Sequence, residues 1–174
     1  MAFGSYGTIP AELLEREFPI VVDHFGYIPD SGGAGKFRGS LSVVKQWRFL
    51  EPGQVMLRTN RTQRPSEGLT GGQLGGLSQN RLFQAQEQES VALAPQTHLH
   101  LKVSPGDRIH HVVSGSGGHG DPLERDPDEV LADVKADKVT VRAARVQYGV
   151  VIDPQGGVDA AATTALRRQM GARV

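Results

Sequence analysis

The sequence predicts an α+β fold: a β-rich antiparallel sandwich or distorted barrel with short helices at the C-terminal end. Three observations support this prediction. Short apolar runs broken by Gly and Pro fill residues 18–113, capped segments rich in Ala, Arg and Asp fill residues 123–174, and a glycine-dense elbow at 114–122 separates them. The length of 174 residues suits one domain with a substantial core, so we expect a single domain over 1–174.

Composition excludes several classes of function. Nineteen Lys and Arg balance nineteen Asp and Glu, which disfavours nucleic acid and anionic membranes as partners. The absence of Cys excludes disulfides and thiolate metal sites and suits a reducing compartment. No apolar run approaches the roughly 20 residues of a membrane span. We therefore expect a cytoplasmic protein without a membrane partner.

The first elements are read from local signals. Residues 8–17 predict a short helix with Thr8 as its N-cap. The β-branched run at 20–25 predicts a strand, and residues 26–40 form a long glycine-rich stretch with no helix or strand signal. A loop of that length is usually functional or held by a neighbour.

Two hairpins are expected in the middle of the chain. Residues 41–50 and 55–59 read as strands joined by the turn Glu-Pro-Gly. Residues 97–103 alternate with period two, and Ser-Pro-Gly-Asp then predicts a type II turn into a returning strand at 108–113. A further short strand is expected at 81–85.

The C-terminal part carries clear helix signals. Asp121 and Asp126 each stand before Pro, with Glu three residues on, and the second of these N-cap patterns predicts the main helix. Further caps and turns predict, in order, a helix over 141–148 between Thr140 and Gly149, a strand over 150–153, and a helix from Asp159 to about residue 170.

Three glycine-rich loops are candidates for contact with a ligand or another chain. Gly115, Gly117 and Gly120 satisfy the dinucleotide-binding pattern G-x-G-x-x-G, but the match is weak because the loop does not open into a helix. A phosphate loop is excluded by spacing, since Asp30 stands where that motif needs glycine. Gly117→Val is expected to disturb assembly more than folding, provided that Gly117 has φ > 0. The candidate ligand or interface residues are Asp30, Ser31, Gly32, Gly33, Gly35, Lys36, Arg38, Arg58, Arg61, Gly71, Gly72, Gly117, Gly118, His119 and Asp121.

The histidines suggest a second kind of site. His98 and His100 lie on one face of a predicted strand, with His110 and His111 on the strand expected to face it, so a metal site is geometrically possible. A solvated amphipathic strand explains the same pattern. His98 and His100 are therefore only weak metal candidates, and neither they nor any other residues form a recognisable catalytic set.

The chain resembles the C-terminal part of the hydantoinase B family, which includes 5-oxoprolinase and is related to acetone and acetophenone carboxylase subunits. Three motifs carry the resemblance: Glu-Phe-Pro at 17–19 followed by Pro-Asp-Ser-Gly-Gly-Ala-Gly-Lys-Phe-Arg-Gly at 29–39, Gly-Leu-Thr-Gly-Gly at 68–72, and residues 115–124 with Asp126-Pro127. The resemblance runs in the family's order from about residue 8 to residue 153.

The resemblance implies a small accessory subunit that completes a split hydantoinase B-like component of an ATP-dependent cyclic amide hydrolase. Hydantoinase A-like and remaining hydantoinase B-like subunits are the implied partners; ATP and a divalent metal are expected on those partners, with no cofactor on this chain. A subunit of a related ATP-dependent ketone carboxylase is one alternative, and a stand-alone histidine-based metal or ligand-binding module is another. Under the first interpretation the chain supplies loops and interface and is not itself catalytic.

Overall fold

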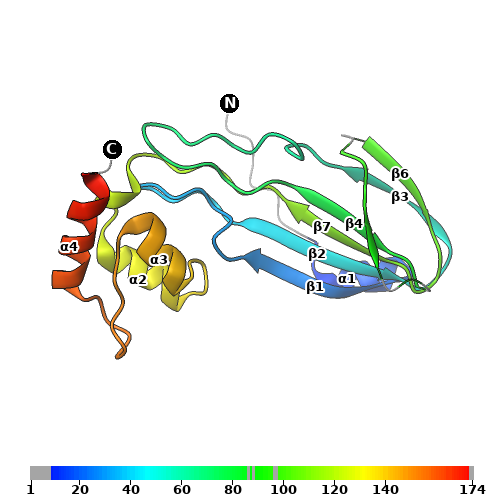
Figure 1. Ribbon diagram of the computed structural model, residues 1–174. Coiled ribbons are helices and arrows are strands. Elements are labelled where there is room, and N and C mark those ends of the chain that lie inside the picture. Colours follow the sequence, from blue (N-terminus) through cyan, green and yellow to red (C-terminus); the bar gives the residue numbers. More distant parts are fainter. Residues whose placement is uncertain (1–8, 86, 88, 96–97, 173–174) are drawn as a thin grey trace.

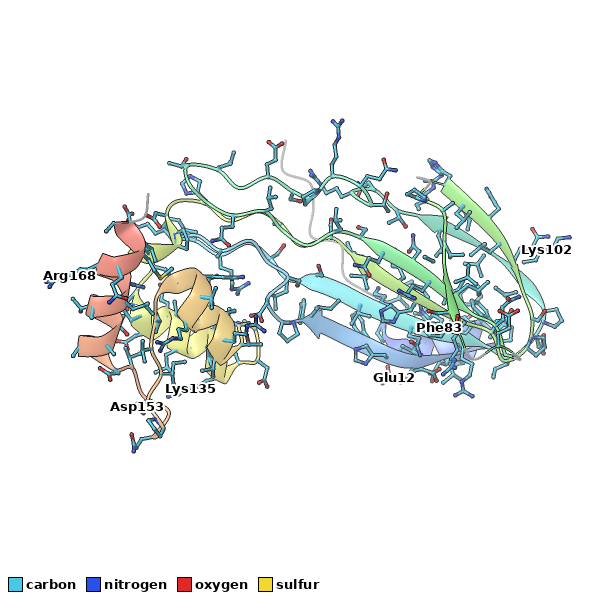
Figure 2. The ribbon with its side chains drawn as sticks, in the orientation of Figure 1. Glu12, Phe83, Lys102, Lys135, Asp153 and Arg168 are labelled. Atoms are coloured by element: carbon cyan, nitrogen blue, oxygen red, sulfur yellow. The ribbon has the colours of Figure 1, made fainter. Side chains whose placement is uncertain are left out.

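The strands and most of the helices lie at opposite ends of the molecule. The computed structural model describes residues 9–85, 87, 89–95 and 98–172. Figure 1 shows the β-sheets at one end, helices α2 to α4 at the other, and extended segments running between them. In Figure 2, Phe83 and Lys102 mark the sheet end, and Lys135 and Arg168 mark the helical end.

Seven strands form two antiparallel sheets. The larger sheet has the order β1-β2-β7-β4-β5 and the smaller sheet pairs β3 with β6. Their bounds are β1 Ile20–Ile28, β2 Ser42–Phe49, β3 Gly53–Arg58, β4 Gln79–Phe83, β5 Ser90–Ala92, β6 His98–Val103 and β7 Arg108–Val113.

The two sheets share one apolar core. Phe49 and Ile109 of the larger sheet pack in the same buried cluster as Leu57 and Val103 of the smaller sheet. Ile109 is 0% exposed. Apolar side chains from two sheets meeting in one layer make a sandwich, and because the strands described here do not close on themselves, the predicted sandwich is confirmed over the distorted barrel.

Both predicted hairpins are wrong in their pairing. β2 pairs with β1 and β7, whereas β3 pairs with β6, so the turns after Phe49 and after Val103 each carry the chain from one sheet to the other. The turn itself was read correctly, since Gly106 has a φ of +88°, as the third position of a type II turn requires. The signals for a turn are local, but burial of the apolar faces decides which strands pair.

Two further predictions need correction, and one strand was missed. β1 continues through Gly26 to Ile28, because those residues pair with β2, where a loop was expected. The sequence reading missed β5, a strand of three residues. The strand expected at 150–153 is only an isolated bridge between Ile152 and Val158.

The C-terminal helix predictions are confirmed with their caps. The side chains of Asp121, Asp126, Thr140 and Asp159 accept hydrogen bonds from backbone N–H groups two or three residues on, and Gly149 ends its helix at a φ of +63°. The bounds are α1 Ala11–Glu17, η1 Pro122–Glu124 (a 3-10 helix), α2 Pro127–Lys135, α3 Val141–Tyr148 and α4 Ala160–Gly171. Pro10 precedes α1; the predicted cap Thr8 lies outside the described residues.

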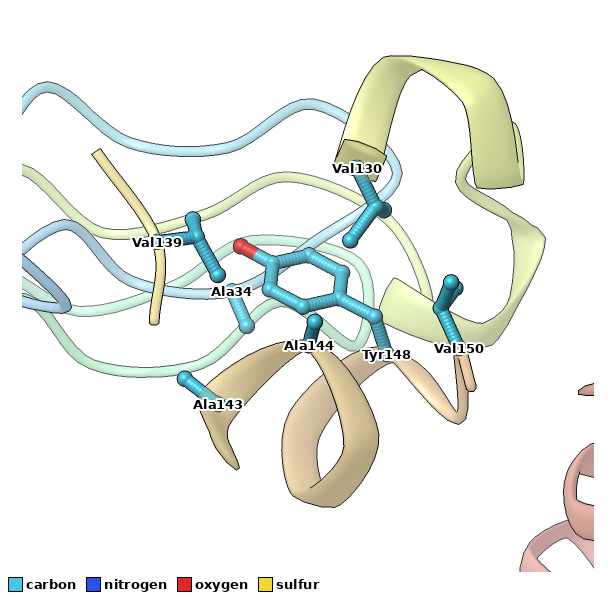
Figure 3. Packing of buried hydrophobic residues seen from close by; sticks show 7 residues of the cluster. All are labelled: Ala34, Val130, Val139, Ala143, Ala144, Tyr148 and Val150. Carbon is cyan, nitrogen blue, oxygen red and sulfur yellow. The ribbon is translucent and has the colours of Figure 1, made fainter. Parts of the chain in front are cut away.

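The helical end has its own small core, centred on Tyr148. Its ring packs against Val130 of α2, Ala144 of α3, and Val139, and is 1% exposed (Figure 3). Burial raises the pKa of Tyr148 to about 12, so the hydroxyl stays protonated at neutral pH. Ala34, which belongs to the first glycine-rich loop, completes this core. No helix in the described part of the chain is long and apolar enough to cross a bilayer.

Candidate functional site

The three glycine-rich loops come together as one bundle between the sheets and the helices. We call residues 31–40, 66–76 and 114–120 the glycine bundle. Each segment bonds to both others through the backbone: Gly33 N donates to Ser116 O (2.9 Å), Gln73 N to Ala34 O (2.7 Å), and Leu69 N to Gly118 O (2.9 Å). The bundle is therefore held by main-chain hydrogen bonds between segments remote in sequence.

Glycine is required in the bundle because the backbones leave no space for a side chain. A Cβ on Gly117 would lie 2.8 Å from Gly68 N and closer still to the carbonyl of Glu67, and a Cβ on Gly118 would lie 2.6 Å from the carbonyl carbon of Ala34. Collagen needs glycine for the same steric reason at its crowded axis. Gly117 does not have the positive φ that the sequence-based expectation required, so space and not backbone conformation selects glycine here.

Two residues predicted to contact a ligand or an interface form hydrogen bonds within the chain. Asp30, at a φ of +61°, accepts hydrogen bonds from both the backbone N and the hydroxyl of Thr140, each at 2.7 Å. It thereby ties the entry of the bundle to the start of α3. Ser31 donates to Ile28 O and accepts from Ser42 N at 2.7 Å, which links the bundle to β2.

A nearly buried charge network joins the bundle to α2. Asp133 of α2 accepts from Arg38 Nε (2.9 Å) and Arg38 Nη2 (3.2 Å), and also from Arg125 Nη2 (3.0 Å). The side chains of Arg38, Asp133 and Arg125 are 15%, 8% and 11% exposed. Arg125 further donates to the carbonyl of Lys36 (3.0 Å). Arg38 thus links the bundle to α2 through its ion pair with Asp133.

The remaining candidates in and beside the bundle divide into exposed side chains and closely packed glycines. Lys36 Nζ is 3.2 Å from Glu124 in an exposed ion pair, and Asp121 caps η1. The exposed His119 ring lies 6.0 Å from that of Phe37, centroid to centroid, and pairs by a backbone bridge with Leu69. Gly71, with a φ of +91°, turns the second segment; Gly32, Gly33, Gly35 and Gly72 are packed against neighbouring backbone.

A pocket lined mostly by polar residues, which we call the polar pocket, lies beside β3, β6 and β7 and contains candidates from two of the predicted groups. The sequence placed Arg58 and Arg61 in one group and His98 in another. In the structure, Arg58 of β3 pairs with His98 of β6. His111 of β7 lines the same pocket. The cavity is about 330 Å³ and is lined by Arg58, Thr59, Asn60, Ser78, His98, His111 and Val113.

Sequence reasoning missed part of this polar pocket and misplaced other members. Thr59, Asn60 and Ser78 carry no motif that separates them from ordinary loop residues. Arg61 is exposed, at a φ of +54°, and its carbonyl accepts from Ser78 N at 3.0 Å; it does not line the pocket. In the described residues, no group of three or more His, Cys, Asp or Glu is placed to hold a metal ion.

Hydrogen bonds fix the state of His111 in the pocket. Asn80 Nδ2 donates to Thr59 Oγ1 (2.9 Å), which leaves Asn80 Oδ1 as the partner of His111 Nδ1 at 2.6 Å. A carboxamide oxygen only accepts, so His111 Nδ1 carries the proton and Nε2 is the free nitrogen. The ring stacks on Trp47 with centroids 6.0 Å apart. Burial, followed by the charges of Lys45 and His110, lowers the pKa of His111, so the imidazole is neutral at pH 7.

Acidification is expected to destabilise the fold through the histidines of β7. The pKa of His110 is also lowered, by burial first and then by His24 and Arg81. The unfolded chain keeps the ordinary histidine pKa of about 6.5, so on acidification it takes up protons before the folded chain does, which favours unfolding. Stability is therefore fully present above this pH and is lost as the pH falls through it toward the lowered folded-state pKa values.

Melting temperatures between pH 8 and pH 5 measure this effect. The wild-type Tm should fall across that range, and the fall should be smaller in His111→Gln, which no longer has the buried imidazole. His100→Gln, which replaces an exposed histidine of β6, should keep the wild-type slope. Equal slopes in all three proteins would show that His111 does not contribute.

A separate apolar groove is lined by residues of both sheets and lies beside α1. Its volume is about 560 Å³. Phe18 and Met56 are 57% and 50% exposed there. Its lining consists of Leu14, Phe18, Pro19, Ile20, Trp47, Phe49, Glu51, Pro52, Gly53, Gln54, Val55, Met56, Leu57 and Val103.

Comparison with known proteins identifies similar sequences that are much longer. Residues 2–122 match the family model described as hydantoinase B/oxoprolinase. The chain is 36% identical to the beta subunit of caprolactamase from Pseudomonas jessenii, over 95% of this chain and 29% of that protein. It is 28% identical to the B subunit of a putative D-/L-hydantoinase from Pseudomonas sp. (strain NS671), over 91% of this chain and 27% of that protein.

Two solved structures share the fold. The crystal structure of the ATP-dependent caprolactamase from Pseudomonas jessenii matches with a TM-score of 0.77 and 33% identity, covering 91% of this chain and 28% of that one. The nucleotide-free structure of acetone carboxylase matches with a TM-score of 0.79 and 22% identity, covering 98% and 27%; at that identity the likeness concerns the fold alone. The chain spans less than a third of the length of each of these relatives.

Proposed function

The chain belongs to the hydantoinase B/oxoprolinase family, and we propose that it forms one portion of the hydantoinase B-like component of a multi-subunit, ATP-dependent cyclic amide hydrolase. Its partners in this proposal are the remaining hydantoinase B-like portion and a hydantoinase A-like chain. The similarity to the caprolactamase beta subunit supports a cyclic amide as the substrate class.

The apolar groove is the observation that carries this proposal. Its lining includes the exposed Phe18 and Met56 together with the polar residues Glu51 and Gln54. A continuous apolar surface of this kind, rimmed by polar residues, marks a site of protein interaction. Since the relatives contain more than twice as much additional polypeptide, the remaining hydantoinase B-like portion is the occupant that we assign to the groove.

The bundle supports a structural contribution rather than a catalytic one. The polar side chains of Asp30, Ser31 and Arg38 are bonded within the chain, and its backbone amides bond to each other. These contacts hold the segments of the chain together, which supports a structural contribution. We therefore place ATP, the divalent metal ion and the reacting groups on the partner chains, against which the bundle and groove form a wall.

Purification of the complex through a tag on this chain, followed by native mass spectrometry, tests the proposal. We expect co-purification of hydantoinase A-like and hydantoinase B-like polypeptides. ATP turnover by that complex should rise with a lactam or a hydantoin. Turnover that rises only with a ketone and bicarbonate would assign the complex to the carboxylases instead, and isolation of this chain alone would contradict the proposal.

Met56→Glu is expected to weaken assembly with little effect on the chain itself. Met56 lies on β3, lines the groove and is 50% exposed, so a carboxylate there is tolerated in water but must be desolvated in an apolar interface. We expect roughly tenfold or more weaker association and a Tm within about 2 °C of wild type.

Val91→Glu provides the matched control. Val91 is also 50% exposed, but it lies on β5 and does not line the groove. This variant should assemble like the wild type when both are compared by pull-down and analytical ultracentrifugation. If the two variants assemble equally well or equally poorly, the groove is not the docking surface.

A further inference from the structure

We propose that the polar pocket lined by Arg58, Ser78 and His111 binds a small carboxylate that also carries an N–H group. This inference concerns the chain itself and does not depend on the proposed assembly. The carboxylate contacts Arg58, and the N–H group donates to His111 Nε2. The proposal follows from the hydrogen-bonding capacity that the lining residues retain after their contacts within the chain are counted.

The pocket presents donors and a positive charge to an anion. None of its lining residues is acidic, and in the described part of the chain Arg58 forms no ion pair. Ser78 Oγ accepts from Ser114 N at 2.9 Å, so its hydroxyl hydrogen remains available to donate. The planar guanidinium of Arg58 fits a carboxylate through two parallel hydrogen bonds, and Asn60 at the rim adds an amide donor.

The same pocket also contains one acceptor with a defined position. Asn80 holds His111 Nδ1 in its protonated form at 2.6 Å, and the ring is neutral because its pKa is lowered by burial. The lone pair on Nε2 is therefore directed away from Asn80 and can accept a hydrogen bond from a ligand. A ligand with a carboxylate alone would leave this acceptor unused, whereas a carboxylate with a neighbouring N–H group satisfies both ends of the pocket.

Size and lining limit the ligand further. A cavity of about 330 Å³ lies at the lower end of the range for small-molecule sites. Val113 supplies an apolar wall for a short carbon chain or ring between the two polar ends. Because Arg58 and His98 are exposed, affinity for a minimal ligand is expected to be on the order of millimolar.

Three matched probes test the recognition on the purified full chain. N-acetylglycine has both the carboxylate and the N–H group; N-acetylsarcosine carries a methyl group in place of that hydrogen, and N-acetylglycinamide lacks the carboxylate. Titration calorimetry, with NMR of the histidine ring protons, should give saturable binding of N-acetylglycine. We expect binding about fivefold or more weaker for N-acetylsarcosine and at least about tenfold weaker for N-acetylglycinamide.

Two variants connect those differences to particular residues. Arg58→Gln should weaken N-acetylglycine at least about tenfold, whereas Arg64→Gln, an exposed arginine that does not line the pocket, should bind like the wild type. His111→Phe keeps an aromatic ring on Trp47 and should bring the affinities for N-acetylglycine and N-acetylsarcosine to within about twofold of each other. Because Arg58 is exposed, its replacement leaves folding intact and keeps the test interpretable if His111→Phe unfolds.

Several outcomes would overturn the inference. These are an absence of saturable N-acetylglycine binding, equal binding by Arg58→Gln and wild type, or tighter binding of inorganic phosphate than of N-acetylglycine. Tighter phosphate binding would identify a general anion site. Co-purification of partner subunits would be unaffected by any of these results, so failure here is distinguishable from failure of the proposed function.

Discussion

Gly117→Ala is expected to destabilise the chain by about 3 kcal/mol, because the added methyl group has no space between the segments of the bundle. The new Cβ would lie within 2.8 Å of Gly68 N and closer to the carbonyl of Glu67. Those atoms are backbone and are held in the bundle by hydrogen bonds, such as that from Leu69 N to Gly118 O. Relief of the clash must therefore separate two segments of the bundle and break such bonds. Chemical denaturation monitored by circular dichroism measures the loss.

Gly171→Ala is the control for this prediction. Gly171 lies at the end of α4, and nothing lies within 4 Å of a Cβ built there. Alanine in a helix is more stable than glycine by roughly 0.5–1 kcal/mol, so this variant should be neutral or slightly more stable. A Gly117→Ala protein as stable as Gly171→Ala would show that the bundle can widen freely. It would also restore the sequence-based expectation that changes at Gly117 affect assembly before folding.

Asp133→Ala is expected to cost about 3–5 kcal/mol, because it leaves the Arg38 guanidinium without a counter-charge in a nearly buried position and leaves Arg125 with only the exposed carboxylate of Glu129, at 3.3 Å. Arg38 and Arg125 both bond to the Asp133 carboxylate, at 2.9 Å and 3.0 Å for the shortest contacts. Their side chains are only 15% and 11% exposed, so water replaces the lost carboxylate poorly. Thermal and denaturant unfolding of the purified chain test the prediction.

An exposed ion pair in the same region gives the comparison. Glu124 contacts Lys36 at 3.2 Å, with side chains 62% and 48% exposed, and Glu124→Ala should change stability by less than about 1 kcal/mol. Asp133→Ala should also loosen α2 from the bundle, since Arg38 belongs to the bundle and Asp133 to the helix. Protease cleavage near α2 that is no faster in Asp133→Ala than in Glu124→Ala would contradict this account.

The sequence predicted best the elements whose ends are determined by neighbouring residues. Thr140 and Gly149 delimit α3 at both ends, as expected, because an N-cap and a left-handed glycine act within a few residues of themselves. Most strands of the two sheets were found, with the exception of β5, but their partners were not. The hairpin expected after Phe49 fails because Leu57 reaches the buried cluster only when β3 pairs with β6 in the second sheet.

The candidate site was harder to predict, for the same reason. The glycine loops were recognised as sites of close approach, but what approaches them is another part of the same backbone. Asp30 bonds to Thr140 and Arg38 bonds to Asp133 across most of the chain, and no local pattern reveals such pairs. The polar pocket combines Arg58, His98 and His111 from three strands, of which the sequence grouped the two histidines without the arginine.

The glycine bundle also has a consequence for the rate at which the molecule folds. Each of its three segments forms backbone hydrogen bonds with both of the others. When only two segments are present, some backbone groups of each therefore lack their partners. During synthesis, residues 31–40 and 66–76 must wait in water until residues 114–120 have left the ribosome. Such long-range closure is slow compared with helix formation. The last segment to be made therefore sets the pace of folding, and until it is made the apolar side chains of Phe37, Leu69 and Leu74 remain on segments that cannot yet close.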